Sequence, residues 1–311
     1  MTLEEAIAKI KPLDHNAMEI AQKRWDSIAK PLHSLGKLET LLIQIAGITG
    51  NAEVDLSRRG LIAMCADNGV VEEGVTQTGQ EVTAIVAENF LKYDTSVGVM
   101  CKQNHAEIFP VDMGMVTDTK VRTDHKIAYG TQNMTKGPAM TREQAVKGLE
   151  AGIDMVRELN DKGYRILATG EMGIGNTTTS SAVASVLLKQ PVEEMTGRGA
   201  GLTSEGLVRK INAIKKAITL NKPDPEDAID VLAKVGGLDI AGMAGVFLGG
   251  AVYGIPVVMD GFISCVSALI AMRICPAARD YILASHVSKE PAAHLILENM
   301  GKEAIIHADM C

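Results

Sequence analysis

The chain has 311 residues, enough to bury a large core in one domain or in one domain with a smaller appendage. Its net charge of -7 argues against a nucleic-acid backbone or an anionic membrane as the main partner, because both attract clustered Lys and Arg. A small-molecule partner is therefore expected. The cysteines are odd in number and unclustered, which indicates neither a disulfide framework nor a metal knuckle and favours a reducing, cytoplasmic compartment; they are Cys65, Cys101, Cys265, Cys275 and Cys311.

Helices alone are predicted for the first part of the chain, over residues 3–10, 17–28 and 37–48. The third helix carries an apolar stripe, so it has to bury one face against another element. A polar turn, KPLHSLGKLE, separates the second and third helices. From Leu61 onward, short apolar runs alternate with helical stretches, which is typical of a parallel sheet with crossover helices. A domain boundary is expected near residue 55.

Four of the apolar runs end in an acid that is followed closely by a glycine. These acids are Asp67, Asp112, Glu171 and Asp260. Because the carboxyl ends of parallel strands share one edge where ligands bind, the four side chains are expected around a single crevice. The alternative for any one of them is that it caps the following helix. Together they favour a crevice that suits a cationic centre.

The stretch from Tyr164 to Ser185 combines a buried strand, a tight turn and a helix start. Glu171 lies in the turn, and Gly173 and Gly175 allow the backbone to approach a ligand closely. The hydroxyl groups of residues 177–180 are expected to cap the helix. Such a helix start offers free N–H groups and a positive dipole end to an anion such as phosphate.

A dinucleotide-binding motif is a second interpretation of the same turn. Gly173, Gly175 and Thr178 match the G-x-G-x-x-G spacing without its last glycine. Glu193 or Glu194 lies about where a ribose-binding acid would be. This pattern would indicate a nucleotide-binding oxidoreductase.

Four further patterns have ordinary interpretations. Lys210 lies beside the apolar face of a predicted helix, and its spacing alone indicates a solvated lysine. The histidines show no metal-ligand spacing and are expected at the surface or at helix ends, so no metal is predicted. Ser285 and Ser288 precede a helical run, either as N-caps or as a second anion-binding helix start. The apolar run 240–259 is broken by glycines and Pro256, which favours a packed helix and strand over a membrane span.

Five stretches that occur in order along the chain are KPLHSLGKLE, MCADNGVVEEGV, GEMGIGNTTTSSA, VLAKVGGLDIAGMAG and PVVMDGFIS. Together they resemble the motifs of the nicotinate-nucleotide:dimethylbenzimidazole phosphoribosyltransferase family, which builds the lower-ligand nucleotide of cobalamin. The resemblance implies an α/β fold, with a Rossmann-like parallel sheet and flanking helices plus a small helical domain from the chain ends. It divides the chain into a helical part at 1–55, the Rossmann-like domain at 56–285 and a C-terminal helical segment at 286–311. It also implies a homodimer with active sites near the subunit interface.

The reaction implied by the resemblance moves phosphoribose from nicotinate mononucleotide to an aromatic base such as dimethylbenzimidazole. The products are nicotinate and alpha-ribazole phosphate, and no cofactor is expected. The pyridinium leaving group departs neutral at the ring and needs no general acid, while positive charge spreads over the ribose carbon and ring oxygen. Carboxylates near the ribose are therefore useful.

The resemblance makes Glu171 the supporting acid inside the pocket. It places the aromatic base near Thr78 and Val86, and it includes Asp67 among the substrate-binding residues. Contacts to the phosphate, the ribose and the rest of the substrate are assigned to Gly173, Gly175, Asn176, Thr177, Lys210, Gly261, Ser264 and Ser288. This assignment turns Lys210 from a solvated lysine into a candidate ligand.

The chain departs from the family pattern in three places. The motif L-G-E-G-[ST]-G-A, whose glutamate is the general base in this family, is expected to begin just beyond Cys311. Asn68 stands where histidine is usual, and Val86 replaces a glutamine, which favours a more apolar base pocket. Two alternatives follow: a different lower ligand, such as a phenol or a purine, or a non-catalytic subunit that completes a heterodimer with a catalytic paralogue.

Overall fold

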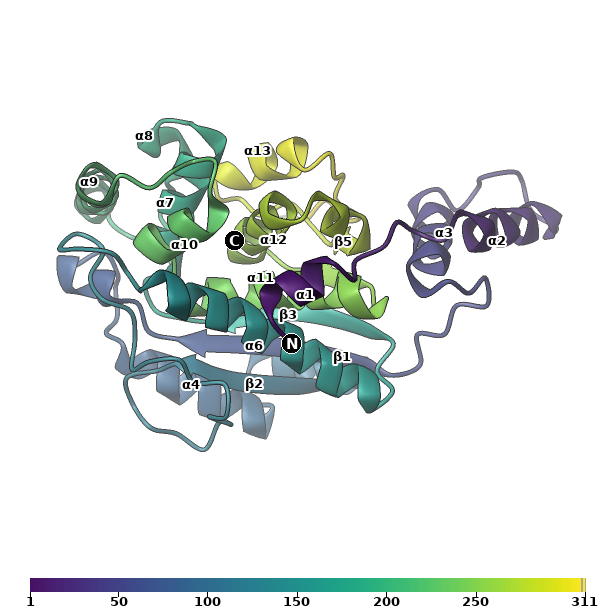
Figure 1. The fold of residues 1–311 in the computed structure, drawn as a ribbon, viewed down its shortest axis with the longest axis horizontal. Helices are drawn as coiled ribbons and strands as arrows, with labels where there is room; N and C mark the ends of the chain where they lie inside the picture. The colour runs from purple at the N-terminus through teal and green to yellow at the C-terminus, as the bar shows by residue number, and fades with distance from the viewer. Residues whose placement is uncertain (309, 311) are drawn as a thin grey trace.

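The computed structural model describes residues 1–308 and 310, and it is built around a parallel sheet of five strands (Figure 1). The strand order is β2-β1-β3-β4-β5, and every neighbouring pair is parallel. The strands are β1 (Arg59–Ala66), β2 (Ala106–Gly114), β3 (Ile166–Met172), β4 (Val257–Met259) and β5 (Ile282–Ala284). The predicted α/β class with a parallel sheet is confirmed.

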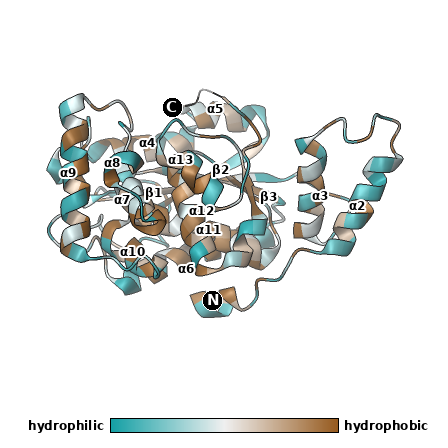
Figure 2. Ribbon diagram, turned by 90° about the horizontal axis from the view of Figure 1, so that it is seen from above, coloured by the Kyte–Doolittle hydropathy of each residue, from teal (hydrophilic) through white to brown (hydrophobic). Residues whose placement is uncertain are grey.

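Apolar side chains cover both faces of the sheet, which is why its strands are continuous apolar runs rather than alternating patterns. On one face, Ala63 and Cys65 of β1 belong to a hydrophobic cluster that includes residues of the helices α4 (Glu81–Lys92) and α5 (Ser96–Gln103). On the other face, Ile62 and Met64 belong to the larger core. That core includes α6 (Arg142–Asp161), α11 (Leu238–Tyr253) and α12 (Phe262–Ile274), and α11 and α12 form an apolar centre in Figure 2.

Helices α6 and α11 pack so closely that their backbones touch. A Cβ atom on Gly152 of α6 would run into the Gly242 carbonyl oxygen and lie 2.7 Å from the Val246 nitrogen. A Cβ atom on Gly245 of α11 would lie 2.9 Å from the Gly152 Cα atom. Every residue of α11 from Leu238 to Ala251 is buried. Glycines on both helices therefore allow α11 to lie against α6 on one side and the sheet on the other.

The helices α2 (His15–Ser27) and α3 (Lys37–Thr49) form a hairpin set apart at one end of the molecule (Figure 1). The turn between them is the KPLHSLGKLE motif. Its Lys30 and Glu39 side chains form a buried ion pair of 2.9 Å, and Glu39 also accepts from the Leu35 backbone N–H. The predicted bounds of these helices agree with the structure to within two residues, whereas the first helix, α1 (Leu3–Ile7), is shorter than predicted.

The two ends of the chain lie on the main body. Helix α1 packs against α11 and α6, and α13 (Ala292–Asn299) packs against α12 and α7 (Asn176–Leu188). The remaining elements are α8 (Val192–Met195), α9 (Ser204–Asn221), α10 (Ala228–Val235) and two 3₁₀ turns at Gly69–Glu73 and Pro276–Tyr281. The division at 1–55, 56–285 and 286–311 stays a prediction.

The apolar run 240–259 forms most of α11 and then β4, a helix followed by a strand as predicted. Within the described part of the chain, no helix combines the length and apolar character needed to cross a bilayer.

Strand order determines where a ligand site is expected. The chain passes from β1 outward to β2, then returns across β1 to β3 and continues to β4 and β5. The direction of winding therefore reverses between β1 and β3, and in open parallel sheets ligands bind at the carboxyl ends beside such a point. Glu171 stands at that end of β3.

We expect Gly152→Ala to destabilise the protein by about 2 kcal/mol or more, because the new methyl group would force α6 away from α11. Urea unfolding measures the loss. Gly137→Ala is the matched control, because a Cβ atom there meets nothing within 4 Å. Equal stability of the two variants would mean that the helix contact adapts freely.

Candidate active site

A cavity of about 710 Å³ opens at the carboxyl ends of β3 and β4. Five predicted site residues line it: Glu171, Thr177, Gly261, Ser264 and Ser288. These residues come from three stretches that lie far apart in the sequence, so the fold brings together what the sequence separates. Asp260, one of the four predicted strand-end acids, also lines the cavity.

Two helices begin at this cavity. Helix α7 starts at Asn176 after Gly175, whose φ of +95° suits glycine, and α12 starts at Phe262 after Gly261. Both are 13 residues long, so each directs the positive end of a substantial dipole toward the cavity. The residue range 177–180 lies inside the helix rather than before it, so the expectation that its hydroxyl groups are N-caps is wrong. Gly175 fills the cap position because the chain needs a left-handed turn there.

Gly173 and Gly175 are required by close packing. A Cβ atom on Gly173 would lie 2.5 Å from Asp239 Oδ2, and one on Gly175 would lie 3.0 Å from Val71 Cγ2. The two glycines therefore make room for neighbouring protein atoms. The close approach to a ligand that the sequence predicted stays a prediction for them.

Lys210 is fully buried rather than solvated. Its Nζ donates to Thr177 Oγ1 over 2.9 Å and to the Gly197 carbonyl oxygen over 3.1 Å. Burial lowers the pKa of Lys210 to about 8. The spacing argument for a surface lysine is thus wrong, because the glycine-rich loop 197–201 folds over the amine. The charge lies just behind the cavity wall at Thr177.

Glu290 shows that the same loop accepts an anionic group. Its Oε1 accepts from the Gly199 N–H over 2.9 Å, and its Oε2 is buried without a hydrogen-bond partner among the described residues. Glu290, Gly199 and Gly201 all line the cavity. A ligand phosphate would compete with this carboxylate for the loop.

A second, smaller hollow of about 140 Å³ lies on the other side of the β3–α7 turn. Thr78 lines it, together with Gly173, Gly175, Asn176 and Thr177. Thr177 also lines the main cavity, so the two spaces share a wall. Val86 is among the lining residues of neither space and packs against the core formed by α4 and the sheet.

Asp67 and Asp112 do not line the main cavity, which corrects the expectation that all four acids share one crevice. Asp67 accepts from the Val116 N–H over 2.8 Å, and Asp112 accepts from the Met115 N–H over 2.8 Å. Asp112 also pairs with Lys126 at 3.1 Å. Both acids hold the loop that follows β2, so neither lines the cavity and neither caps the following helix.

Two residues of the site were missed by sequence reasoning. His286 is buried and lines the cavity, contrary to the expectation that the histidines lie at the surface or at helix ends, and Ser285 Oγ lies 2.9 Å from its Nδ1. The sequence could have indicated His286 because it lies two residues before the predicted site residue Ser288. Asp239 is fully buried and contacts Asn176. The serines do not cap α13, whose cap position is Pro291.

Glu171 is held in a position that opposes its ionisation. The side chain is half-buried, and its accessible part faces the cavity. Burial, and then the negative charge of Asp239, raise the pKa of Glu171 to about 7, although a hydrogen bond from Asn176 acts in the opposite direction. Near neutral pH this carboxyl group therefore exchanges a proton readily, as acid–base catalysis requires.

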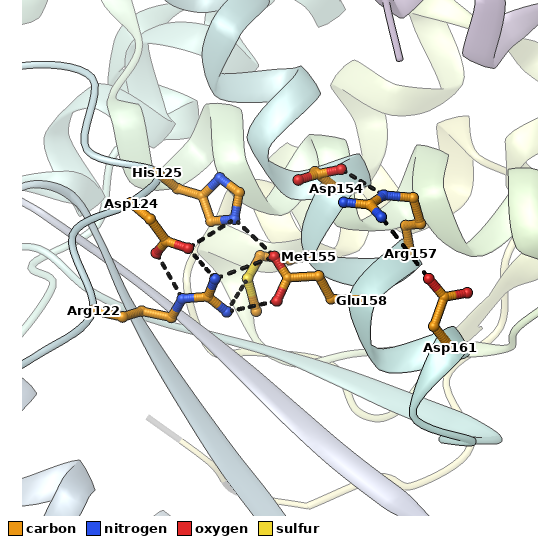
Figure 3. A network of polar contacts seen from close by, with 8 residues as sticks. All are labelled: Arg122, Asp124, His125, Asp154, Met155, Arg157, Glu158 and Asp161. Atoms are coloured by element: carbon orange, nitrogen blue, oxygen red, sulfur yellow. Dashed lines mark hydrogen bonds and ion pairs between the residues drawn. The ribbon is translucent and has the colours of Figure 1, made fainter.

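The only group of possible metal ligands found among the described residues is Asp124, His125 and Glu158, which lies elsewhere on the molecule (Figure 3). Arg122 donates to both carboxylates, at 2.7 Å to Asp124 Oδ1 and 3.0 Å to Glu158 Oε2. A cation would have to displace this guanidinium. The geometry therefore fits an ion-pair network that ties the loop after β2 to α6.

The structure does not support the dinucleotide-binding interpretation, because the acid expected to bind the ribose does not lie at the site. Glu193 forms an ion pair with Lys215 at the surface, and neither Glu193 nor Glu194 lines the cavity or the smaller hollow. A ribose bound at the β3–α7 turn would have no carboxylate where the motif requires one.

Comparisons with known proteins agree with this geometry. A family model described as "Phosphoribosyltransferase" matches residues 10–311. A relative from Ruminiclostridium cellulolyticum is 51% identical, with 100% of this chain and 89% of that protein covered, and one from Clostridium acetobutylicum is 49% identical with the same coverage. Both are named nicotinate-nucleotide--dimethylbenzimidazole phosphoribosyltransferase. The crystal structure of CobT from Thermus thermophilus matches with a TM-score of 0.89 and 35% identity, covering 95% of this chain and 89% of that one.

The protein is thus a phosphoribosyltransferase-type α/β protein with its cavity at the carboxyl edge of a parallel sheet. More narrowly, the chain belongs to the nicotinate-nucleotide--dimethylbenzimidazole phosphoribosyltransferase family. The resemblance carried by the five sequence motifs is confirmed.

We expect Glu171→Gln to stabilise the protein at alkaline pH and to change its stability little near pH 4.5. Because the pKa of Glu171 is raised from 4.5 to about 7 in the folded state, ionisation costs stability progressively as pH rises through this interval. Above pH 7 the variant should therefore have a free energy of unfolding about 2 kcal/mol higher than the wild type, after allowance for the solvent that reaches the Glu171 carboxylate. Urea unfolding between pH 4.5 and 8.5 measures the difference. A gain that does not depend on pH, or that equals the effect of Glu194→Gln at the exposed helix α8, would contradict the argument.

Proposed function

We propose that this protein transfers phosphoribose from nicotinate mononucleotide to dimethylbenzimidazole or a related lower-ligand base. The C1′–N bond of the substrate breaks, its electron pair returns to the pyridinium nitrogen, and the lone pair of the incoming ring nitrogen forms the new bond to C1′. Nicotinate leaves, the product is the alpha-riboside phosphate, and one proton passes from the incoming base to a carboxylate. Membership of the family, over nearly the whole length of its named relatives, is the observation that carries this proposal.

The phosphate has a suitable binding region at the start of α7. Thr177, the buried Lys210 amine and the loop around Gly199 meet there, and the loop already accepts the carboxylate of Glu290. The helix dipole and the lysine charge both favour a dianion. Substrate phosphate would raise the lysine's lowered pKa and hold the amine in its charged form.

The cationic part of the substrate has carboxylates nearby. Glu171 and Asp260 line the cavity on the side of the strand ends. Charge that develops on the ribose carbon and ring oxygen during bond cleavage is stabilised by fixed negative groups that need not reorganise. Glu171 is therefore the supporting acid of the proposed reaction.

The aromatic base is proposed to bind in the smaller hollow. The hollow at Thr78 adjoins the main cavity through Thr177, which supports a base site there, whereas Val86 lines neither space. Asp67 lines neither space and accepts from the Val116 N–H, so its expected contact with substrate gains no support from the geometry. We also propose that the protein acts as a homodimer with active sites near the subunit interface.

The described C-terminal residues lead toward the cavity. Met310 lines it, and the Met310 carbonyl oxygen accepts from the Lys289 N–H over 3.3 Å. We propose that the glutamate of the family's L-G-E-G motif acts as the general base of this reaction.

We expect a chain extended through that motif to form alpha-ribazole phosphate about 100-fold to 10,000-fold faster than residues 1–311, because a positioned general base contributes this much. Product formation from nicotinate mononucleotide and dimethylbenzimidazole at neutral pH is the measurement. Equal rates would place the base within residues 1–311. Absence of product from the extended chain, with either dimethylbenzimidazole or a phenol as acceptor, would favour a non-catalytic subunit.

Replacing the buried amine should separate phosphate binding from base binding. Lys210→Met keeps the side-chain length and should weaken nicotinate mononucleotide by about tenfold to a hundredfold, since a charge-assisted contact contributes about 1.5 to 3 kcal/mol. Affinity for the free aromatic base should stay the same, as measured by calorimetry. Lys216→Met, at an exposed position on the same helix, is the control. Equal losses for both ligands would indicate that Lys210 only supports the fold.

A further inference from the structure

A buried amide group lies between two carboxylates behind the cavity. Asn176 Nδ2 donates to Glu171 Oε2 over 2.6 Å and to Asp239 Oδ2 over 2.9 Å. Glu171 stands at the end of β3, Asn176 is the first residue of α7, and Asp239 is the second residue of α11. One side chain thus connects three elements at the wall of the site.

Asp239 cannot contact a substrate itself. Its exposure is 0%, and it is absent from the lining of the main cavity, unlike Glu171. Its Oδ1 atom is buried without a hydrogen-bond partner among the described residues, so part of its hydrogen-bonding capacity is unused. Burying a carboxylate with one unsatisfied oxygen destabilises the fold, which indicates that Asp239 has a role beyond packing.

Two glycines make the space for this carboxylate. A Cβ atom on Gly173 would lie 2.5 Å from Asp239 Oδ2, and a Cβ atom on Gly237 would lie 2.5 Å from Asp239 Oδ1. Gly173 belongs to the GEMGIGN motif and Gly237 to the KVGGLD motif, so two of the motifs share one physical purpose.

The geometry points to Asp239 as a positioning residue of the transfer reaction: through the Asn176 amide it sets the direction and the charge state of the Glu171 carboxylate. This inference rests on the proposed function only in naming the reaction. An Asn amide can present either its oxygen or its NH₂ group to a neighbour. With a carboxylate oxygen accepting on each side, only the NH₂ group fits between Glu171 and Asp239, so Asp239 helps to fix the amide orientation.

The charge of Asp239 acts in the same direction as burial. Burial raises the pKa of Asp239 to about 6, and its charge contributes to the raised pKa of Glu171. The other ionisable groups around the pair are Asp260 after β4, which also raises the pKa of Glu171, and Asp67 after β1, which raises that of Asp239. Cys65 of β1 lies in the same field, and burial and the surrounding acids raise the pKa of its thiol, so it stays neutral.

Two variants separate orientation from charge. Asp239→Asn keeps an acceptor oxygen for Asn176 but removes the charge, whereas Asp239→Ala removes both. The titration of Glu171 is followed by its protonated-carboxyl infrared band, assigned as the difference between each protein and the same protein carrying Glu171→Gln. We expect the titration midpoint to fall by about one pH unit or more in Asp239→Asn, because a negative neighbour within hydrogen-bonding range of the shared amide is lost.

The transfer reaction supplies the second readout. In the chain extended through the family motif, Asp239→Asn should shift the acid limb of the kcat profile to lower pH with a small loss of kcat. Asp239→Ala should lower kcat by about tenfold to a hundredfold while KM for nicotinate mononucleotide changes less than about threefold, since a misdirected carboxylate affects the transition state more than binding. If Asp239→Ala does not fold, the Asn variant still decides the question.

Asp112→Asn is the matched control, because Asp112 is also a fully buried strand-end carboxylate but bonds the loop at Met115. It should leave the Glu171 midpoint unchanged. An unchanged midpoint in Asp239→Asn, or an equal shift in Asp112→Asn, would overturn the assignment. The infrared titration requires no turnover, so it decides the role of Asp239 even if the wild-type protein transfers no phosphoribose and the proposed function fails.

Discussion

The contact between the backbones of α6 and α11 is the constraint on which the site depends. Glycines on both helices remove the side chains that would separate them, so α11 lies directly between α6 and the sheet. Its first turn is thereby brought beneath the end of β3. Asp239 reaches Asn176 and, through it, Glu171. A helix held a few ångströms further away could bury the same apolar surface but could not deliver this carboxylate.

The ionisable groups around the cavity reduce the stability of the fold. Glu171, Asp239 and Lys210 all have pKa values shifted toward their neutral forms, with burial as the largest cause in each case. Apolar residues of similar volume would be more favourable at these positions. Groups that exchange protons near neutral pH and present charge in a sheltered cavity are what a transfer reaction with a cationic transition state needs. The surrounding core, with its tightly packed glycine and alanine residues, supplies the stability that these groups remove.

The cavity also shows how opposite charges are kept apart within one site. The start of α7, the Gly199 loop and Lys210 lie on one side and favour an anion, whereas Glu171 and Asp260 lie near the strand ends and favour a cation. A nucleotide with a phosphate at one end and a positively charged ring at the other is complementary to this arrangement. Glu290 lies on the anion side, where its carboxylate accepts a hydrogen bond from the Gly199 N–H.

The sequence by itself determined the parallel α/β class, the helices of the first fifty residues and the acid-then-glycine pattern at the strand ends. Each of these follows from local periodicity or from short motifs, which neighbouring residues dictate. The tertiary structure alone decided which strand ends meet: Glu171 and Asp260 line the cavity, while Asp67 and Asp112 hold a loop. It also decided that Lys210 and His286 are buried and that Asp239 stands behind Glu171. These outcomes depend on the order of strands in the sheet and on the closeness of two helices, and neither is encoded within the span of a single motif.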